Sequence, residues 1–119
     1  MTTKEIAGQL VDNCRKGDFQ KAQKNLFSDD AVSIEPYATP AFEKETKGIK
    51  AILDKAEKFD SMVETMHSME VSDPLVADNS FACTMTMDVT MKGRDRMHMT
   101  ELCVYEVKDG KIVREEFVR

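Results

Sequence analysis

Three side chains of this sequence could exchange protons with a bound molecule. Glu35 directly precedes Pro36 at the end of a short alternating segment, whereas His67 and Glu101 lie within longer segments of the same kind. A carboxylate whose pKa is raised by burial can act as a base or an acid near neutral pH, and an imidazole titrates there without any shift. If the three side chains share a pocket, they predict proton transfer to and from a ligand.

Period-two alternation predicts which side of its strand each residue faces. His67 is expected on the same face as three apolar residues, Val63, Met69 and Val71. Glu101 is expected on a face that also carries Met97, Met99, Cys103, Tyr105 and Val107. Asp88 and His98 are expected to face outward, because each alternates with apolar residues that should point into the interior.

Each of these residues also has a purely structural interpretation. Glu35 could be a solvated carboxylate at a strand end, His67 a histidine satisfied within the core, and Glu101 one half of an ion pair. Glu115 and Glu116 point to opposite faces of the last strand, and a bulge would change which of them points inward, so both stay open. The charges at the two termini are expected to be solvated.

The sequence contains no motif that would hold a metal ion or a cofactor. Its two histidines are far apart, and it has no phosphate loop, dinucleotide fingerprint or Ser/His/Asp motif. The three cysteines, Cys14, Cys83 and Cys103, form no CxxC pair. We expect them to be reduced thiols that pack as small hydrophobic groups. We therefore predict that the protein binds no metal ion and no cofactor.

The elements that must position these residues fall into two halves. Thr2 and Glu5 fit a capping box that starts a helix over residues 3–16, and Asp18 can cap a second, shorter helix that ends at the polar turn 28–30. A short strand 31–35, a loop 36–47 and a third helix from Ile49 through Phe59 follow. The period then changes to two, which predicts strands over 62–72, 75–77, 81–91, 96–107 and 111–118, the last pair joined by the Asp109-Gly110 turn.

Length and charge limit the class of protein. A chain of 119 residues with a net charge of −5 predicts one domain, residues 1–119, of the α+β class, and it argues against a nucleic-acid binder, which needs a clustered positive surface. No apolar run approaches the roughly 18 to 20 residues that cross a bilayer, and the polar first residues lack a signal-peptide core. We expect a cytoplasmic protein that binds neither nucleic acid nor membrane.

Two segments resemble the nuclear transport factor 2-like superfamily, and within it the SnoaL-like family. They are Leu26-Phe27-Ser28-Asp29-Asp30-Ala31-Val32-Ser33-Ile34-Glu35-Pro36, followed by Lys47-Gly48-Ile49, and the closing hairpin Val107-Lys108-Asp109-Gly110-Lys111-Ile112-Val113. The resemblance implies a curved antiparallel sheet wrapped around three helices, a cone with a pocket at its wide end. The family includes ketosteroid isomerases, polyketide cyclases and dehydratases, together with binding modules.

The resemblance also assigns roles to particular residues. Glu35 occupies the place of the carboxylate that shuttles a proton in ketosteroid isomerases, and His67 would face the pocket. The acid that binds an oxyanion there corresponds to Cys103, or to Glu101 if the register slips by two. The catalytic tyrosine position holds Leu10, so steroid isomerisation is not expected. Tyr37 and Tyr105 could replace it as donors.

Two functions follow from this resemblance. The first is an isomerase, cyclase or dehydratase acting next to a carbonyl, with Glu35 as base and His67 or Glu101 as donor. The second is a non-catalytic ligand-binding or accessory module. In both, the ligand is small and apolar or carbonyl-bearing, and the outer sheet face would form a homodimer. The residues expected to line the pocket are Tyr37, Met85, Met87, Met99, Cys103 and Tyr105.

Methionine is concentrated in the second half of the chain. Of 9 methionines, every one except Met1 lies between Met62 and Met99. Met85, Met87, Met91, Met97 and Met99 fall on strand faces that are expected to line the interior. Unbranched methionine side chains either fill an irregular core or form a deformable pocket wall, and the sequence leaves both possibilities open.

Overall fold

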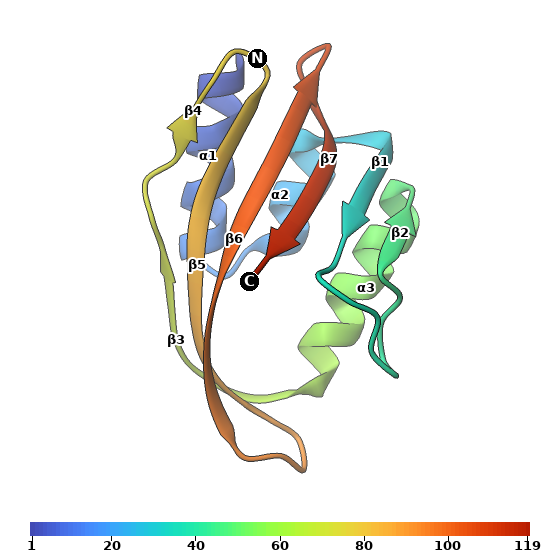
Figure 1. The fold of residues 1–119 in the computed structure, drawn as a ribbon, viewed down its shortest axis with the longest axis vertical. Helices are drawn as coiled ribbons and strands as arrows, with labels where there is room; N and C mark the ends of the chain where they lie inside the picture. Colours follow the sequence, from blue (N-terminus) through green and yellow to red (C-terminus); the bar gives the residue numbers. More distant parts are fainter.

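The computed structural model describes residues 1–119 as three helices and a seven-stranded sheet (Figure 1). The helices are α1 (Thr3–Arg15), α2 (Phe19–Leu26) and α3 (Ile49–Met62). The strands are β1 (Phe27–Ile34), β2 (Glu45–Lys47), β3 (Val63–Val71), β4 (Leu75–Val76), β5 (Ser80–Met91), β6 (Arg96–Lys108) and β7 (Lys111–Val118). None of the helices is both long and apolar enough to cross a bilayer.

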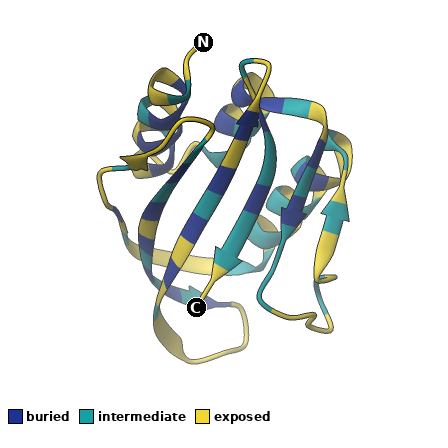
Figure 2. Ribbon diagram, turned by 45° about the horizontal axis from the view of Figure 1, so that its top comes forward, coloured by how far each residue is buried: buried dark blue, intermediate teal, exposed yellow.

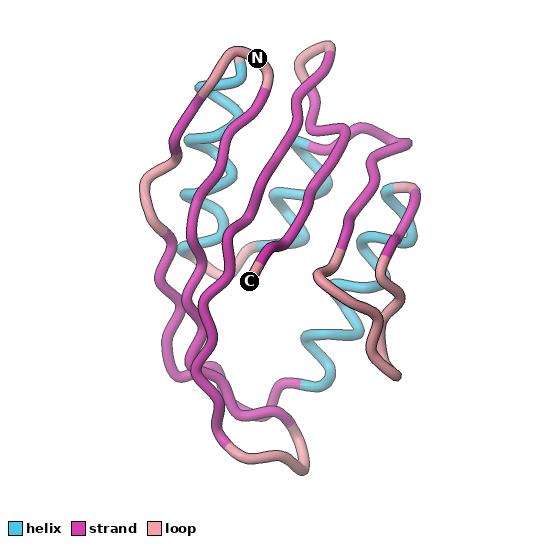
Figure 3. The backbone as a smooth tube through the Cα atoms, viewed as in Figure 1, coloured by secondary structure: helices cyan, strands magenta, loops and turns pink.

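The sheet has the order β2-β1-β7-β6-β5-β3, with β4 paired to β5, and it does not close into a barrel. The three helices lie on one side of it (Figure 1). The α+β class and the curved sheet over three helices are therefore confirmed. The sheet is mixed rather than wholly antiparallel, because β1 runs parallel to β7. Strands β5 and β6 continue past α1 and α2 to a hairpin at one end of the molecule (Figure 3).

Local signals in the sequence account for several element boundaries. The capping box at α1 is present, with the Thr2 hydroxyl accepting from the Glu5 amide at 3.2 Å and the Glu5 carboxylate accepting from the Thr2 amide at 3.0 Å. Asp109 and Gly110 both have positive φ, 52° and 74°, as a type I′ hairpin turn requires. These two predictions are confirmed.

Thr2→Ala is expected to lower the free energy of unfolding by about 1 kcal/mol, because it leaves an amide of the first turn without its acceptor. Urea unfolding of the two proteins measures the difference. Thr3→Ala is the matched control: Thr3 is the first helical residue, and its hydroxyl donates instead to the Asp78 carbonyl. An equal loss in both variants would contradict the capping role.

Two predicted elements differ from the structure. The polar turn expected at residues 28–30 is part of β1, whose register on β7 shifts between Phe27 and Val32. The expected loop 36–47 ends in β2, which pairs with β1 through only three residues. Both errors have the same cause, since these polar stretches are held extended by a partner distant in sequence and carry no alternation of their own.

The core lies between the helices and the inner face of the sheet. Buried residues alternate with less buried ones along β5 and along the second half of β6 (Figure 2). Met85, Met87 and Met91 are buried, whereas Met97, near the exposed hairpin, is 41% exposed. The three cysteines are buried free thiols, as predicted. The parts of β5 and β6 that lead into their hairpin extend beyond α1 and α2, toward the end of the molecule where α3 stops (Figure 1).

Candidate functional site

Glu35 lies at the end of β1 and contacts a lysine from α3. The side chain of Glu35 is 27% exposed, and its Oε2 atom is 3.8 Å from Nζ of Lys55. This oxygen is buried and accepts no hydrogen bond. A carboxylate oxygen without a hydrogen-bond donor keeps its lone pairs free to take a proton from another molecule.

Lys55 connects Glu35 to a second, deeper carboxylate. Its ammonium donates to the Ser33 hydroxyl at 2.7 Å, and that hydroxyl donates to Oε2 of Glu115 at 2.8 Å. Ser33 is completely buried and Glu115 is 5% exposed. Lys55 also lies 5.8 Å from the centre of the Phe117 ring. The result is a continuous polar chain from the partly exposed Glu35 into the core.

A bulge in β7 explains why Glu115 points inward. The pairing of β7 with β6 steps from Arg114 opposite Glu106 to Ile112 opposite Val107, which leaves Val113 without a partner. The extra residue places both Ile112 and Glu115 on the inner face. Glu116 lies on the other face, where it pairs with Arg114 at 3.0 Å. Of the two residues whose orientation the sequence left open, Glu115 is therefore the one that points inward.

Burial changes the acidity of Glu115. Loss of solvent raises its pKa from 4.5 to about 7, and the nearby Glu35 carboxylate acts in the same direction. Lys55 and the Ser33 hydroxyl oppose this rise. A carboxyl group with such a pKa is partly protonated at neutral pH and can therefore supply or accept a proton.

Glu101 lies on β6 and faces the same interior. It is 8% exposed, and its Oε2 is 3.5 Å from Nε of Arg119. Burial raises its pKa, Arg119 opposes the rise, and Glu35 adds to it. Arg119 also donates to the Tyr37 hydroxyl at 2.9 Å. Glu101 therefore forms an ion pair, as its structural interpretation expected. The Arg119 side chain takes part in this pair, so the expectation that the charges at the C-terminus are only solvated is wrong for Arg119.

Glu35 links these two acids electrostatically, since it raises the pKa of both Glu101 and Glu115. We call the five charged residues Glu35, Lys55, Glu101, Glu115 and Arg119, together with Ser33, the inner charged cluster. It contains three carboxylates and two cations, so its charges balance when one carboxyl group holds a proton. The structure therefore brings Glu35 and Glu101 into one cluster.

His67 does not join this cluster. It is exposed, and its Nε2 lies 2.8 Å from the Thr90 hydroxyl. The pairing of β3 with β5 shifts by one residue at His67, from Met66 opposite Val89 to Ser68 opposite Asp88, so His67 is an unpaired bulge residue. The prediction that it faces the pocket is wrong, because the bulge interrupts the alternation on which the prediction depends.

The outward orientation of Asp88 and His98 is confirmed. Asp88 accepts two hydrogen bonds from Arg96, at 2.8 and 2.7 Å, and His98 is its register partner on β6. The Arg96 guanidinium lowers the pKa of Asp88, and the two histidines act in the same direction. Neither residue has access to the inner charged cluster from this face.

Most of the predicted pocket-lining residues are packed in the core. Met85, Met87, Cys103 and Tyr105 are at most 7% exposed. Tyr105 stacks on Phe81 with ring centres 4.8 Å apart. The other two residues lie nearer the surface: Met99 is partly buried, and Tyr37 is 55% exposed. Both contact Arg119, whose Nη2 is 3.6 Å from the Met99 sulfur. Their role in lining a ligand pocket stays a prediction.

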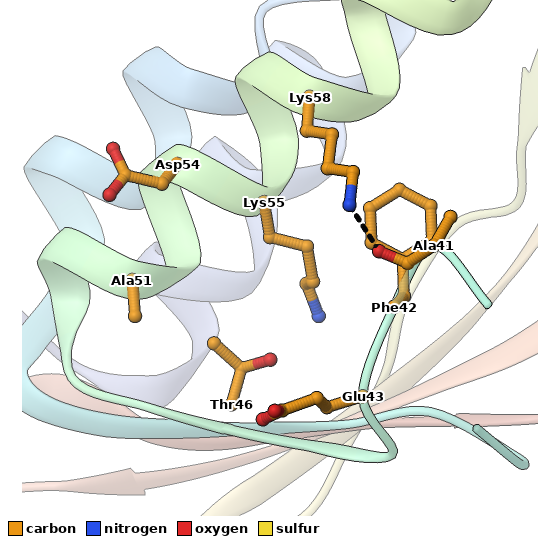
Figure 4. Close-up of a pocket in the computed structure, with 8 residues that line it drawn as sticks. All are labelled: Ala41, Phe42, Glu43, Thr46, Ala51, Asp54, Lys55 and Lys58. Atoms are coloured by element: carbon orange, nitrogen blue, oxygen red, sulfur yellow. Dashed lines mark hydrogen bonds between the residues drawn. The ribbon is translucent and has the colours of Figure 1, made fainter. Parts of the chain in front are cut away.

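An open hollow of about 200 Å³ lies between α3 and the segment that leads into β2. It is lined by Ala41, Phe42, Glu43, Thr46, Ala51, Asp54, Lys55 and Lys58. Lys58 donates to the Ala41 carbonyl, and Lys55 extends from α3 into the hollow (Figure 4). Because the same Lys55 ammonium bonds to Ser33, this hollow adjoins the inner charged cluster.

Sequence reasoning missed Ser33, Lys55 and Arg119. The position of Lys55 carried a usable signal, because it follows Ile52 by three residues and precedes Phe59 by four, which places it on the core-facing side of α3. Ser33 lies two residues before Glu35 and must share its face. Arg119 had no such signal. No group of three or more His, Cys, Asp or Glu side chains is arranged to hold a metal ion.

Comparison with known proteins identifies the family model that this arrangement fits. The model of the SnoaL-like domain matches residues 1–119. A Mesorhizobium loti protein described as a SnoaL-like polyketide cyclase has a similar structure, with 32% sequence identity, a TM-score of 0.93 and coverage of 100% of both chains. Among proteins with curated descriptions, none matches this chain.

Two further solved structures share the fold at lower identity. A Xanthomonas campestris protein with a cystatin-like fold is 18% identical, covers 99% of this chain and 90% of its own, and has a TM-score of 0.83. A Catenulispora acidiphila protein with a ketosteroid isomerase-like fold, solved with trimethylamine, is 15% identical, covers 99% and 87%, and has a TM-score of 0.75.

Proposed function

Because this chain belongs to the SnoaL-like domain family, whose fold is that of small-molecule pocket proteins, we propose that it binds a small carbonyl-bearing molecule and moves a proton at the carbon next to the carbonyl. Glu35 is the base. The observation that supports this most strongly is its buried Oε2 atom, which accepts no hydrogen bond and lies 3.8 Å from a lysine ammonium. No donor engages the lone pairs of this oxygen, and the 27% exposure of the side chain gives a ligand a route to the carboxylate.

The proton transfer itself is simple. The Glu35 carboxylate takes a proton from the carbon beside the carbonyl, the C–H electron pair forms a C=C bond, and the carbonyl π pair moves to oxygen to give an enolate. Return of the proton from Glu35 to a different carbon gives an isomer, and attack by the enolate on an electrophile gives a cyclised product. Both outcomes need a base beside a group that stabilises negative charge.

Glu101 is the proposed proton donor. Burial raises its pKa, which favours the protonated form that a donor requires. His67 cannot share this role, because it is exposed and bonded to Thr90 on the outer face of the sheet. Met99 and Tyr37, which contact Arg119 next to Glu101, are the pocket-lining residues best placed to touch a ligand.

Deuterium uptake from D₂O tests this function without knowledge of the natural substrate. The purified protein is incubated with a panel of small cyclic ketones and β-keto esters, and mass spectrometry follows the exchange of hydrogen beside the carbonyl. We expect at least one compound to exchange faster than in protein-free buffer. Native mass spectrometry on the same panel detects binding. A compound that binds without accelerated exchange in any member of the panel would favour the accessory-module function instead.

The same single domain is proposed to act as a cytoplasmic homodimer. Leu102 and Val118 are register partners on the outer sheet face, and they are 40% and 42% exposed. Covering exposed apolar side chains of this kind favours association. Leu102→Asp is expected to convert a dimer into a monomer in light scattering. Val76→Asp, at a residue 42% exposed on the opposite face of β4, is the control and should leave the mass unchanged. A monomeric wild-type protein would contradict the dimer.

A further inference from the structure

We propose that Lys55 is a second catalytic residue of this site, whose ammonium donates a hydrogen bond to the oxyanion that forms when Glu35 takes a proton. The inference rests on the proposed function and deepens it. It gives the site a group that stabilises negative charge, and it defines the ligand as one that develops charge on a carbonyl oxygen. Enzymes commonly place preorganised donors where such charge develops.

The Lys55 ammonium has N–H groups that donate no hydrogen bond within the protein. It carries three N–H groups, and the structure gives it one hydrogen bond, to Ser33 at 2.7 Å. Its distance of 3.8 Å to Glu35 is that of an ion pair without a hydrogen bond. N–H groups without an acceptor therefore remain beside the base.

The separation of base and donor suits one ligand. In an enolising ketone the carbon that loses the proton and the oxygen that gains charge are two bonds apart, so base and donor must lie within a few ångströms of each other. Oε2 of Glu35 and Nζ of Lys55 are 3.8 Å apart and come from different elements, the end of β1 and α3. A ketone that lies beside this pair can bring its acidic carbon to Glu35 and its oxygen to Lys55.

Ser33 and Glu115 are positioning residues for Lys55. The Ser33 hydroxyl accepts from Lys55 and donates to Glu115, and both residues lie in the core where neither can move into solvent. On α3, the completely buried Ile52 fixes the turn that carries Lys55. A lysine has four rotatable bonds, and these contacts remove much of that freedom before a ligand arrives.

The Lys55 side chain is also accessible from outside. It is 16% exposed and lines the open hollow between α3 and residues 41–46 (Figure 4). Ala41, Phe42 and Ala51 give this otherwise polar hollow an apolar part that can contact the hydrocarbon of a ligand. Leu10 is 2% exposed within the core and provides no competing donor.

Binding of cyclohexane-1,3-dione, a small diketone that is an enolate at neutral pH, tests the inference. Isothermal titration calorimetry is expected to show that wild-type protein binds the enolate and that Lys55→Met weakens binding at least about tenfold, the loss expected when a charged hydrogen bond is removed. Lys55→Arg should retain most of the affinity. Lys50→Met, at an exposed position of α3 outside the hollow, is the matched control and should bind like the wild type. No binding by the wild type, or equal binding by Lys55→Met, would overturn the inference.

Deuterium exchange separates this inference from the proposed function. Exchange that is catalysed by the wild type and equally by Lys55→Met would overturn the role of Lys55 while the role of Glu35 stands. Enolate binding that depends on Lys55, without catalysed exchange of any ketone, would contradict the proposed function and support the oxyanion contact. Ser33→Ala gives a variant that keeps the ammonium. It should lower kcat more than it raises KM, because it loosens the donor without removing it.

Discussion

Glu35→Gln is expected to slow catalysed deuterium exchange by about 10²- to 10⁴-fold, the usual contribution of a general base. The amide has nearly the shape of the carboxylate but cannot accept the proton. The buried Oε2 makes no hydrogen bond that the substitution would break, and Lys55 keeps its bond to Ser33, so the fold should be unaffected. The rate is measured by mass spectrometry on the ketone that the wild-type protein exchanges fastest.

Two controls make the Glu35 result specific. Glu45→Gln removes an equal charge from β2, where the side chain is 52% exposed and 4.0 Å from Lys47, and it should exchange at the wild-type rate. Native mass spectrometry should show that Glu35→Gln still binds the ketone. If Glu35→Gln retained the wild-type exchange rate, Glu35 would not be the base.

Glu115→Gln is expected to change how the free energy of unfolding depends on pH. The pKa of Glu115 is raised from 4.5 to about 7 in the folded protein. Between these values the folded state binds more protons than the unfolded state, so the carboxyl group makes the protein less stable as pH rises. A pKa difference of this size lowers the free energy of unfolding by about 3 kcal/mol between pH 4 and pH 8. The amide introduced by the substitution does not ionise, so the variant should gain about that much over the wild type across this range.

The groups facing Glu115 come from three elements: Ser33 and Glu35 from β1 and its end, Lys55 from α3, and Tyr105 from β6. Urea unfolding at a series of pH values measures the stability of both proteins. Glu116→Gln, at the neighbouring residue on the outer face, is the control and should follow the wild-type curve. A difference between Glu115→Gln and the wild type that does not grow with pH would show that the Glu115 pKa is not raised.

The sequence predicted the elements where the signal is local. The capping box before α1, the hairpin turn at Asp109-Gly110 and the alternation along β5 each depend on neighbouring residues, and the structure contains all three. The parallel pairing of β1 with β7 and the short strand β2 depend on residues far apart in the chain. Nothing local to Glu45–Lys47 marks a strand.

Bulges account for what the sequence could not predict at the site. Glu35 was predicted from its resemblance to a proton-shuttling carboxylate, and Glu101 because unbroken alternation places it on one face with Cys103 and Tyr105. The bulge at His67 directs a residue outward that alternation would place inside, and the one at Val113 turns Glu115 inward. A bulge changes the facing of every residue beyond it, and its position is set by strand pairing.

Mapping a bound enolate by NMR shows whether a ligand binds at the inner charged cluster. Amide shift changes are recorded on adding cyclohexane-1,3-dione to uniformly ¹⁵N-labelled protein. We expect the largest changes at Glu35, Lys55 and Glu101 and at their sequence neighbours. Changes confined to Thr90, His98 and the rest of the outer sheet face, or no changes at all, would mean that the ligand does not bind at this cluster.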